Sequence, residues 1–138
     1  MEEKMNLVIY TDGASRGNPG PGAIAFLILD GRGEILREHK HFIGVCTNNV
    51  AEYRALIAAL ERARKLGDEA TCFSDSKLMI NQLKGKYKVK KKHLKELFDR
   101  VKKIEREFRK VRYSNVRRTD PDIKKVDRMV NEVLDQIG

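Results

Sequence analysis

The sequence contains no run of roughly 18 consecutive apolar residues, so it predicts no membrane-spanning helix. Residues 1–4 (MEEK) are polar and acidic, which is not the pattern of a secretory signal peptide. Only two cysteines occur, Cys46 and Cys72, and they lack C-x-x-C spacing. We interpret both as buried thiols, which favours a reducing, cytoplasmic location. Because repeats and linkers are also absent, we expect one domain over residues 1–138.

Acidic residues are scarce in the second half of the chain. Residues 77–118 hold 17 lysines and arginines against four acids, a local charge of +13 in a chain whose net charge is +9. A basic region on an otherwise mildly acidic chain indicates a polyanionic partner. Nucleic acid is favoured over a phospholipid surface, because no apolar anchor accompanies the charge.

The apolar residues that are present alternate between strand and helix periods. Strands are expected at residues 7–10, 23–29, 34–43, 69–74 and 111–116. Helices are expected at residues 50–66, 76–83 and 93–108, and from residue 120 onward. The order βββαβααβα predicts an α/β domain with a five-stranded mixed sheet and helices on both faces.

One connection carries more glycine than a chain reversal needs. Residues 13, 17, 20 and 22 are glycines, and they follow an acid, Asp12, near the end of the first expected strand. Glycine permits a positive φ or the close approach of a ligand. Asp12 alone is equally consistent with a turn former, so its role depends on whether other carboxylates converge on it.

Three further carboxylates are placed toward the same end of the sheet. Asp75 follows the fourth strand, at the edge where open α/β sheets bind ligands. Glu52, in the first turn of its helix, and Asp127, in the last helix, lie beside apolar stripes. Plainer interpretations are a capping-box residue for Glu52, a helix cap for Asp75 and a surface acid for Asp127. Four converging acids would repel one another without cations, so the set favours a pair of divalent metal ions.

Four sequence blocks together resemble type 1 ribonuclease H, in its compact archaeal and bacterial form. They are YTDGASRGNPG (10–20), TNNVAE (47–52), SDS (74–76) and VDR (126–128), in the family's order over essentially the whole chain. The resemblance implies the ribonuclease H-like fold. It also implies hydrolysis of the RNA strand of RNA/DNA hybrids to 5′-phosphate and 3′-hydroxyl products by two-metal-ion catalysis. Two Mg²⁺ or Mn²⁺ ions would bind, with substrate present, to the catalytic acids Asp12, Glu52, Asp75 and Asp127.

The same resemblance implies a set of substrate-binding residues. Asn18, Asn48 and Asn49 match minor-groove contacts, and Thr47 matches a contact to a DNA phosphate. Glu52 would also accept the ribose 2′-hydroxyl that distinguishes RNA from DNA. The remaining expected contacts are Gly13, Ser76, Arg118, Lys86, Lys88 and Lys90.

The chain departs from the family pattern at two places. Relatives with a basic protrusion carry an extra helix where this chain has only residues 84–92, which form either a reduced grip on the nucleic-acid backbone or a solvated connector. Many relatives carry a histidine in the loop before the last acid, but residues 117–122 contain none. Arg118, water or no group would take its place, and His39, His41 and His93 are expected on the surface.

We expect a monomer that binds an RNA/DNA hybrid, with duplex RNA left open as a further substrate. Two other functions also stay open. A catalytically silent nucleic-acid-binding module of this fold is disfavoured by the four intact acids. A DNA nuclease or strand transferase of the same superfold usually has extra DNA-binding domains, for which 138 residues leave no room.

Overall fold

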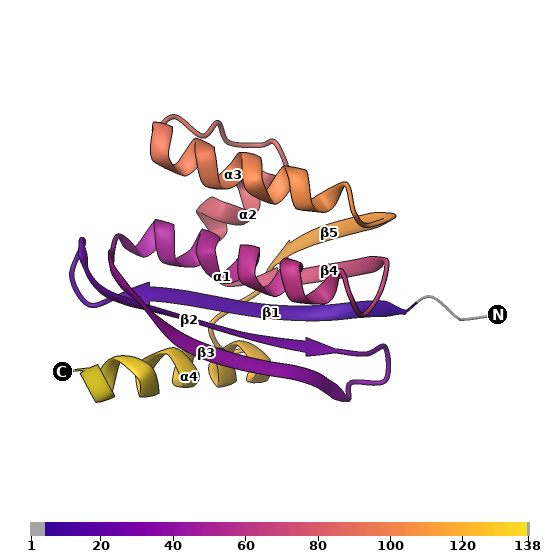
Figure 1. The fold of residues 1–138 in the computed structure, drawn as a ribbon, viewed down its shortest axis with the longest axis horizontal. Coiled ribbons are helices and arrows are strands. Elements are labelled where there is room, and N and C mark those ends of the chain that lie inside the picture. The colour runs from indigo at the N-terminus through magenta and orange to yellow at the C-terminus, as the bar shows by residue number, and fades with distance from the viewer. Residues whose placement is uncertain (1–4, 138) are drawn as a thin grey trace.

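A five-stranded sheet with helices on both faces forms the framework of the computed structural model, which describes residues 5–137 (Figure 1). The strands lie in the order β3-β2-β1-β4-β5. The elements follow the predicted order along the chain: β1 (Asn6–Ser15), β2 (Gly20–Leu29), β3 (Ile35–Cys46), α1 (Asn48–Ala63), β4 (Glu69–Ser74), α2 (Lys77–Leu83), α3 (Lys92–Glu105), β5 (Lys110–Asn115) and α4 (Pro121–Ile137).

The central strand β1 is where the direction of the sheet changes. It pairs antiparallel with β2 and parallel with β4, while β3 and β5 extend the sheet antiparallel and parallel respectively. The mixed sheet predicted from the sequence is therefore confirmed. The parallel pair of β1 and β4 brings the carboxyl ends of two strands together at one edge.

Two cores cover the two faces of the sheet. Phe26 and Ile28 of β2 pack toward α1, α2 and α3, whereas Ala25 and Leu27 pack toward α4. Successive side chains of a strand point to opposite faces, so a strand buried on both faces is continuously apolar. Figure 1 shows α1 and α3 on one side of the sheet and α4 on the other.

Short polar residues set the start of three helices. Thr47 Oγ1 accepts a hydrogen bond from Val50 N at 3.3 Å at the start of α1. Ser76 caps α2 in the same way, and Asp120 Oδ1 accepts from the first backbone amides of α4. Such caps satisfy amides that have no partner within the helix.

Several predicted boundaries are wrong by a few residues. β1 continues past Asp12, which pairs with Ala25 in the middle of the ladder instead of ending the strand. The helix α1 begins at Asn48, so Glu52 lies in its second turn and is not a capping-box residue. Likewise, β3 extends to Cys46 and α3 ends at Glu105. Backbone pairing and cap geometry, which set these limits, are weakly encoded in apolar periodicity.

Two surface expectations also need correction. Cys72 is buried, but Cys46 is only partly buried and does not belong to the core. His41 and His93 are exposed as predicted, whereas His39 is half-buried and its ring lies against that of Phe26. Among residues 5–137, no helix combines the length and apolarity needed to cross a bilayer.

Candidate active site

Two acids meet at the carboxyl edge of the parallel strand pair. β1 and β4 are in register through Tyr10 and Phe73, so Asp12 and Asp75 lie equally far beyond that pair. Asp12 is still within β1, whereas Asp75 follows the last residue of β4. This edge is where ligands bind in open α/β sheets, as the sequence pattern predicted.

Glycine at position 13 allows α1 to deliver a third acid to this edge. A Cβ atom at Gly13 would lie 2.2 Å from the carbonyl oxygen of Ala51, so only glycine permits this approach of helix to strand. The Gly13 amide then donates a hydrogen bond to Glu52 Oε1 at 3.0 Å. Gly13 therefore positions Glu52 directly, and its expected contact with substrate stays a prediction.

The three acids form a tight, largely buried cluster. Carboxylate oxygens of Asp12, Glu52 and Asp75 all lie within 4.8 Å of one another. Asp12 and Glu52 are each 5% exposed. Such a set, made only of carboxylate oxygens, suits a hard divalent cation such as Mg²⁺ or Mn²⁺.

Burial and mutual repulsion raise the pKa of each clustered acid. Burial raises the pKa of Asp12 to about 8, and the charges of Asp75 and Asp127 add to the effect. The pKa of Glu52 is raised by its burial first and then by its two acidic neighbours. For Asp75, burial raises the pKa more than the nearby Arg118 lowers it. Without a cation, the cluster therefore retains protons near neutral pH, and a bound cation would replace them.

Asp127 lies apart from the three-acid group. It is on the exposed side of α4, between the buried residues Val126 and Val130. Its charge nevertheless raises the pKa of Asp12, so it lies on the same side of the sheet edge. The predicted position at the border of the apolar face agrees with this placement.

One cation stands beside the cluster. Arg118, in the loop between β5 and α4, places Nε 3.4 Å from Asp75 Oδ2, and its side chain is 91% exposed. The histidines are on β3 and α3 and not in this loop. An arginine keeps its charge at all physiological pH values, so Arg118 offers charge but no proton transfer.

The amides predicted to contact substrate lock the glycine-rich turn to the start of α1. Asn18 Oδ1 accepts a hydrogen bond from Asn48 N at 3.0 Å, and Asn48 Oδ1 accepts from Ser15 N at 3.3 Å. Neither Nδ2 group has a hydrogen-bond partner within residues 5–137. Both donors therefore remain available at the surface.

The other predicted contacts lie around the same end of the molecule. Thr47 and Ser76 use their hydroxyl groups as helix caps, and Asn49 is the second residue of α1. The segment between α2 and α3 is at the same end as the β1–β2 turn and the start of α1 (Figure 1). It carries the exposed side chains of Lys86, Lys88 and Lys90.

Sequence reasoning assigned no role to two residues that the structure connects with Asp127. Asn131 donates a hydrogen bond to the backbone carbonyl of Asp127 at 3.1 Å, and Arg16 donates to Asn131. The spacing of four residues between Asp127 and Asn131 was a usable signal, because such residues are neighbours on a helix surface. The contact from Arg16, which is 115 positions away, had no sequence signal.

Comparisons with known sequences agree with this geometry. A family described as "Reverse transcriptase-like" matches residues 10–132. A bifunctional protein of Mycobacterium tuberculosis (strain ATCC 25618 / H37Rv) is 41% identical over 133 residues, covering 95% of this chain and 36% of that protein. Ribonuclease HI of Halobacterium salinarum is 39% identical over 127 residues, covering 91% of this chain and 63% of that protein. The chain thus spans only part of the length of these curated relatives.

Solved structures match along nearly their whole length. RNase H1 of the archaeon Halobacterium salinarum NRC-1 has a TM-score of 0.90 and 38% identity, with 95% of this chain and 98% of that chain covered. LC11-RNase H1, isolated from compost and solved in complex with an RNA/DNA hybrid, has a TM-score of 0.89 and 40% identity, with 95% and 98% covered.

The strand order, with acids from two neighbouring strand ends and from the first helix, defines an α/β domain of the ribonuclease H-like class. Within that class, the chain belongs to the type 1 ribonuclease H family. The resemblance seen in the four sequence blocks and the predicted fold are both confirmed.

Proposed function

We propose that this chain is a metal-dependent endoribonuclease that hydrolyses the RNA strand of RNA/DNA hybrids, leaving 5′-phosphate and 3′-hydroxyl ends. The observation that carries the proposal is the cluster of Asp12, Glu52 and Asp75, whose oxygens lie within 4.8 Å of one another. Family membership supports it, since relatives are named ribonuclease H or HI and LC11-RNase H1 was solved with a hybrid.

The acids fit Mg²⁺ or Mn²⁺, and we propose two ions when substrate is bound. Asp12, Glu52 and Asp75 would hold them, with Asp127 joining from α4. Their raised pKa values support this, because a cation relieves the same repulsion that protons otherwise relieve. When bound, the ions supply the positive charge that stabilises the attacking and leaving oxygens of phosphodiester hydrolysis.

Glu52 can connect hydrolysis with the recognition of RNA. Its Oε1 is fixed by the amide of Gly13, which leaves the second carboxylate oxygen outside that hydrogen bond. A carboxylate held in one orientation beside the cleavage site can accept a hydrogen bond from a ribose 2′-hydroxyl. A DNA strand in the same position lacks this group, so Glu52 would favour cleavage of the RNA strand.

Arg118 would contact the phosphate at the cleaved bond. Its guanidinium group lies beside Asp75, and most of its surface faces solvent. It would attract a phosphate and favour the ionised form of Asp75, whose pKa it lowers. Because arginine does not release its proton, we assign it no acid–base step.

The basic segment between α2 and α3 would grip the nucleic-acid backbone. The amides of Lys86 and Tyr87 both donate to the carbonyl oxygen of Asn81, at 2.9 Å and 3.2 Å, which folds the segment back on α2. The lysines at 86, 88 and 90 therefore project from a defined turn. Together with the free donors of Asn18 and Asn48, they give a surface suited to phosphates and to minor-groove edges.

We also propose that residues 1–138 act as one domain, as a monomer and in the cytoplasm. The single shared sheet supports the first point. Both cysteines are free thiols, which fits a reducing compartment. Light scattering at several protein concentrations would test the monomer, because a mass above that of one chain would contradict it.

The decisive experiment is digestion of strand-labelled RNA/DNA hybrid, duplex RNA and duplex DNA with Mg²⁺ or Mn²⁺, using Asp75→Asn as the inactive control. We expect cleavage of the RNA strand of the hybrid, with 5′-phosphate ends, and no cleavage by the control. Hybrid binding without cleavage by the wild type would indicate a silent binding module. Cleavage of DNA would indicate a DNA nuclease.

A further inference from the structure

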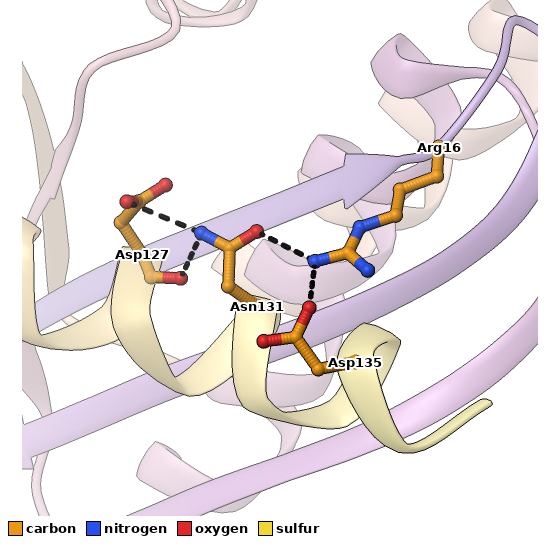
Figure 2. A network of polar contacts seen from close by, with 4 residues as sticks. All are labelled: Arg16, Asp127, Asn131 and Asp135. Carbon is orange, nitrogen blue, oxygen red and sulfur yellow. Dashed lines mark hydrogen bonds and ion pairs between the residues drawn. The ribbon is translucent and has the colours of Figure 1, made fainter. Parts of the chain in front are cut away.

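Asp127 is connected to the glycine-rich turn by a chain of polar contacts outside the four acids. In Figure 2, Asn131 lies between Asp127 and Arg16, and Asp135 lies beside Arg16. We infer that Asn131 and Arg16 are positioning residues that hold the carboxylate of Asp127 for metal binding. The inference rests on the proposed function and extends it to two residues that do not contact the metal.

The distances define the order of the contacts. Asn131 Nδ2 is 3.1 Å from the backbone oxygen of Asp127 and 3.4 Å from its Oδ2. An Nη atom of Arg16 is 3.4 Å from Asn131 Oδ1 and 2.5 Å from Asp135 Oδ1. Asn131 therefore donates toward Asp127 and accepts from Arg16, which is itself held by Asp135.

The residues from α4 form one row on its surface. Positions 127, 131 and 135 are four residues apart, so their side chains follow one another along the helix. Asp12 and Glu52 are held by burial, but the exposed Asp127 is not enclosed by packing. A hydrogen bond from its own helix is a direct way to limit the rotamers of such a carboxylate.

Charge fixes which way the amide of Asn131 points. Its Oδ1 faces the guanidinium group of Arg16, and its Nδ2 faces the carboxylate of Asp127. The reversed amide would place its oxygen against carboxylate oxygen and its NH₂ group against the cation. Arg16 thus acts on Asp127 through Asn131, and Asp135 occupies the guanidinium group.

Residues that orient a metal ligand typically change metal affinity or activity by about 10- to 100-fold when they are removed. This network is exposed, so solvent weakens each contact and we expect the lower end of that range. Asn131→Ala should weaken metal binding about tenfold. Arg16→Ala should weaken it less, because Asn131 can still donate to Asp127.

The test measures Mn²⁺ binding by calorimetry or electron paramagnetic resonance, without nucleic acid, for the wild type, Asn131→Ala, Arg16→Ala and the double variant. The matched control is Glu132→Ala, which removes an exposed ion pair with Lys40 from the same helix. We expect the double variant to bind Mn²⁺ no more weakly than Asn131→Ala. The Mn²⁺ concentration for half-maximal hybrid cleavage should rise in parallel, with the rate recovering at saturating Mn²⁺.

Wild-type Mn²⁺ affinity in Asn131→Ala would overturn the inference. So would an Arg16→Ala variant whose hybrid affinity and salt dependence change while its Mn²⁺ affinity does not, since Arg16 would then be a nucleic-acid contact. A further loss of Mn²⁺ affinity from Asn131→Ala in an Asp127→Asn background would also refute it. Failure of the wild type to cleave hybrid would contradict the proposed function alone, because the binding measurement needs no substrate.

Discussion

Removing the charge of Asp12 should stabilise the metal-free protein. Asp12 is buried among acids, so its ionised form is unfavourable in the folded state, and its pKa rises to about 8. The unfolded chain releases that proton near its ordinary pKa of 3.8. Between these two values the folded state binds more protons, so the wild type should lose stability as pH rises. Asparagine has no such titration, so Asp12→Asn should escape the loss.

The size of the effect follows from the same pKa difference. Each unit corresponds to about 1.4 kcal/mol, so a pKa of about 8 against 3.8 gives at most roughly 4 kcal/mol at pH 7. Glu52 and Asp75 compete with Asp12 for the same protons, so neutralising one acid recovers only part of this free energy. We expect Asp12→Asn to raise the free energy of unfolding by about 1–3 kcal/mol at pH 8 and by little at pH 4.

Urea unfolding followed by circular dichroism, at several pH values in EDTA and again in excess Mg²⁺, measures this difference. The matched control is Asp99→Asn, an exposed acid of α3 that pairs with Lys95, where a change below about 1 kcal/mol is expected. Mg²⁺ should stabilise the wild type more than Asp12→Asn, because it binds the folded site. A wild-type stability that stays level or rises from pH 5 to pH 8 in EDTA would refute the reasoning. So would an Asp12→Asn variant that is less stable than the wild type at pH 8.

Three further predictions concern cleavage and binding. Asp75→Asn should reduce hybrid cleavage to below a few per cent of the wild-type rate, on the order of the loss of a metal ligand, and leave hybrid binding nearly intact. Neutralising the three lysines of the basic segment should weaken binding of all sequences and flatten the salt dependence by roughly 0.7–0.9 per lost contact; these are Lys86, Lys88 and Lys90. Arg118→Ala should lower turnover by about tenfold or less, and the pH–rate profile should rise into the alkaline range without a histidine inflection.

Each of these predictions has a contrary outcome. Substantial cleavage by Asp75→Asn would remove Asp75 from the metal site. An unchanged salt slope in the lysine variant would restore the interpretation of residues 84–92 as a solvated connector. A neutral-pH inflection that disappears in His39→Ala, or a loss above a hundredfold in that variant, would bring a histidine into the reaction.

Local chemistry in the sequence was enough to predict the order of elements. The apolar run of β2 is buried on both faces, and the stripe of α1 faces the sheet, so both periods carried a direct structural meaning. Asp75 was also placed correctly, because Ser74 ends a strand and Ser76 caps the next helix. Such features depend on neighbours within a few residues, which a sequence displays.

Only the tertiary structure decided how the site is assembled. The ladder with β2 carries β1 past Asp12, and the close approach of Ala51 to Gly13 sets the position of Glu52. The raised pKa of Asp12 arises from burial and from acids on other elements, and the link from Arg16 to Asn131 spans 115 positions. These properties depend on distances between segments remote in the chain. Backbone pairing and packing set those distances, and apolar periodicity leaves them open.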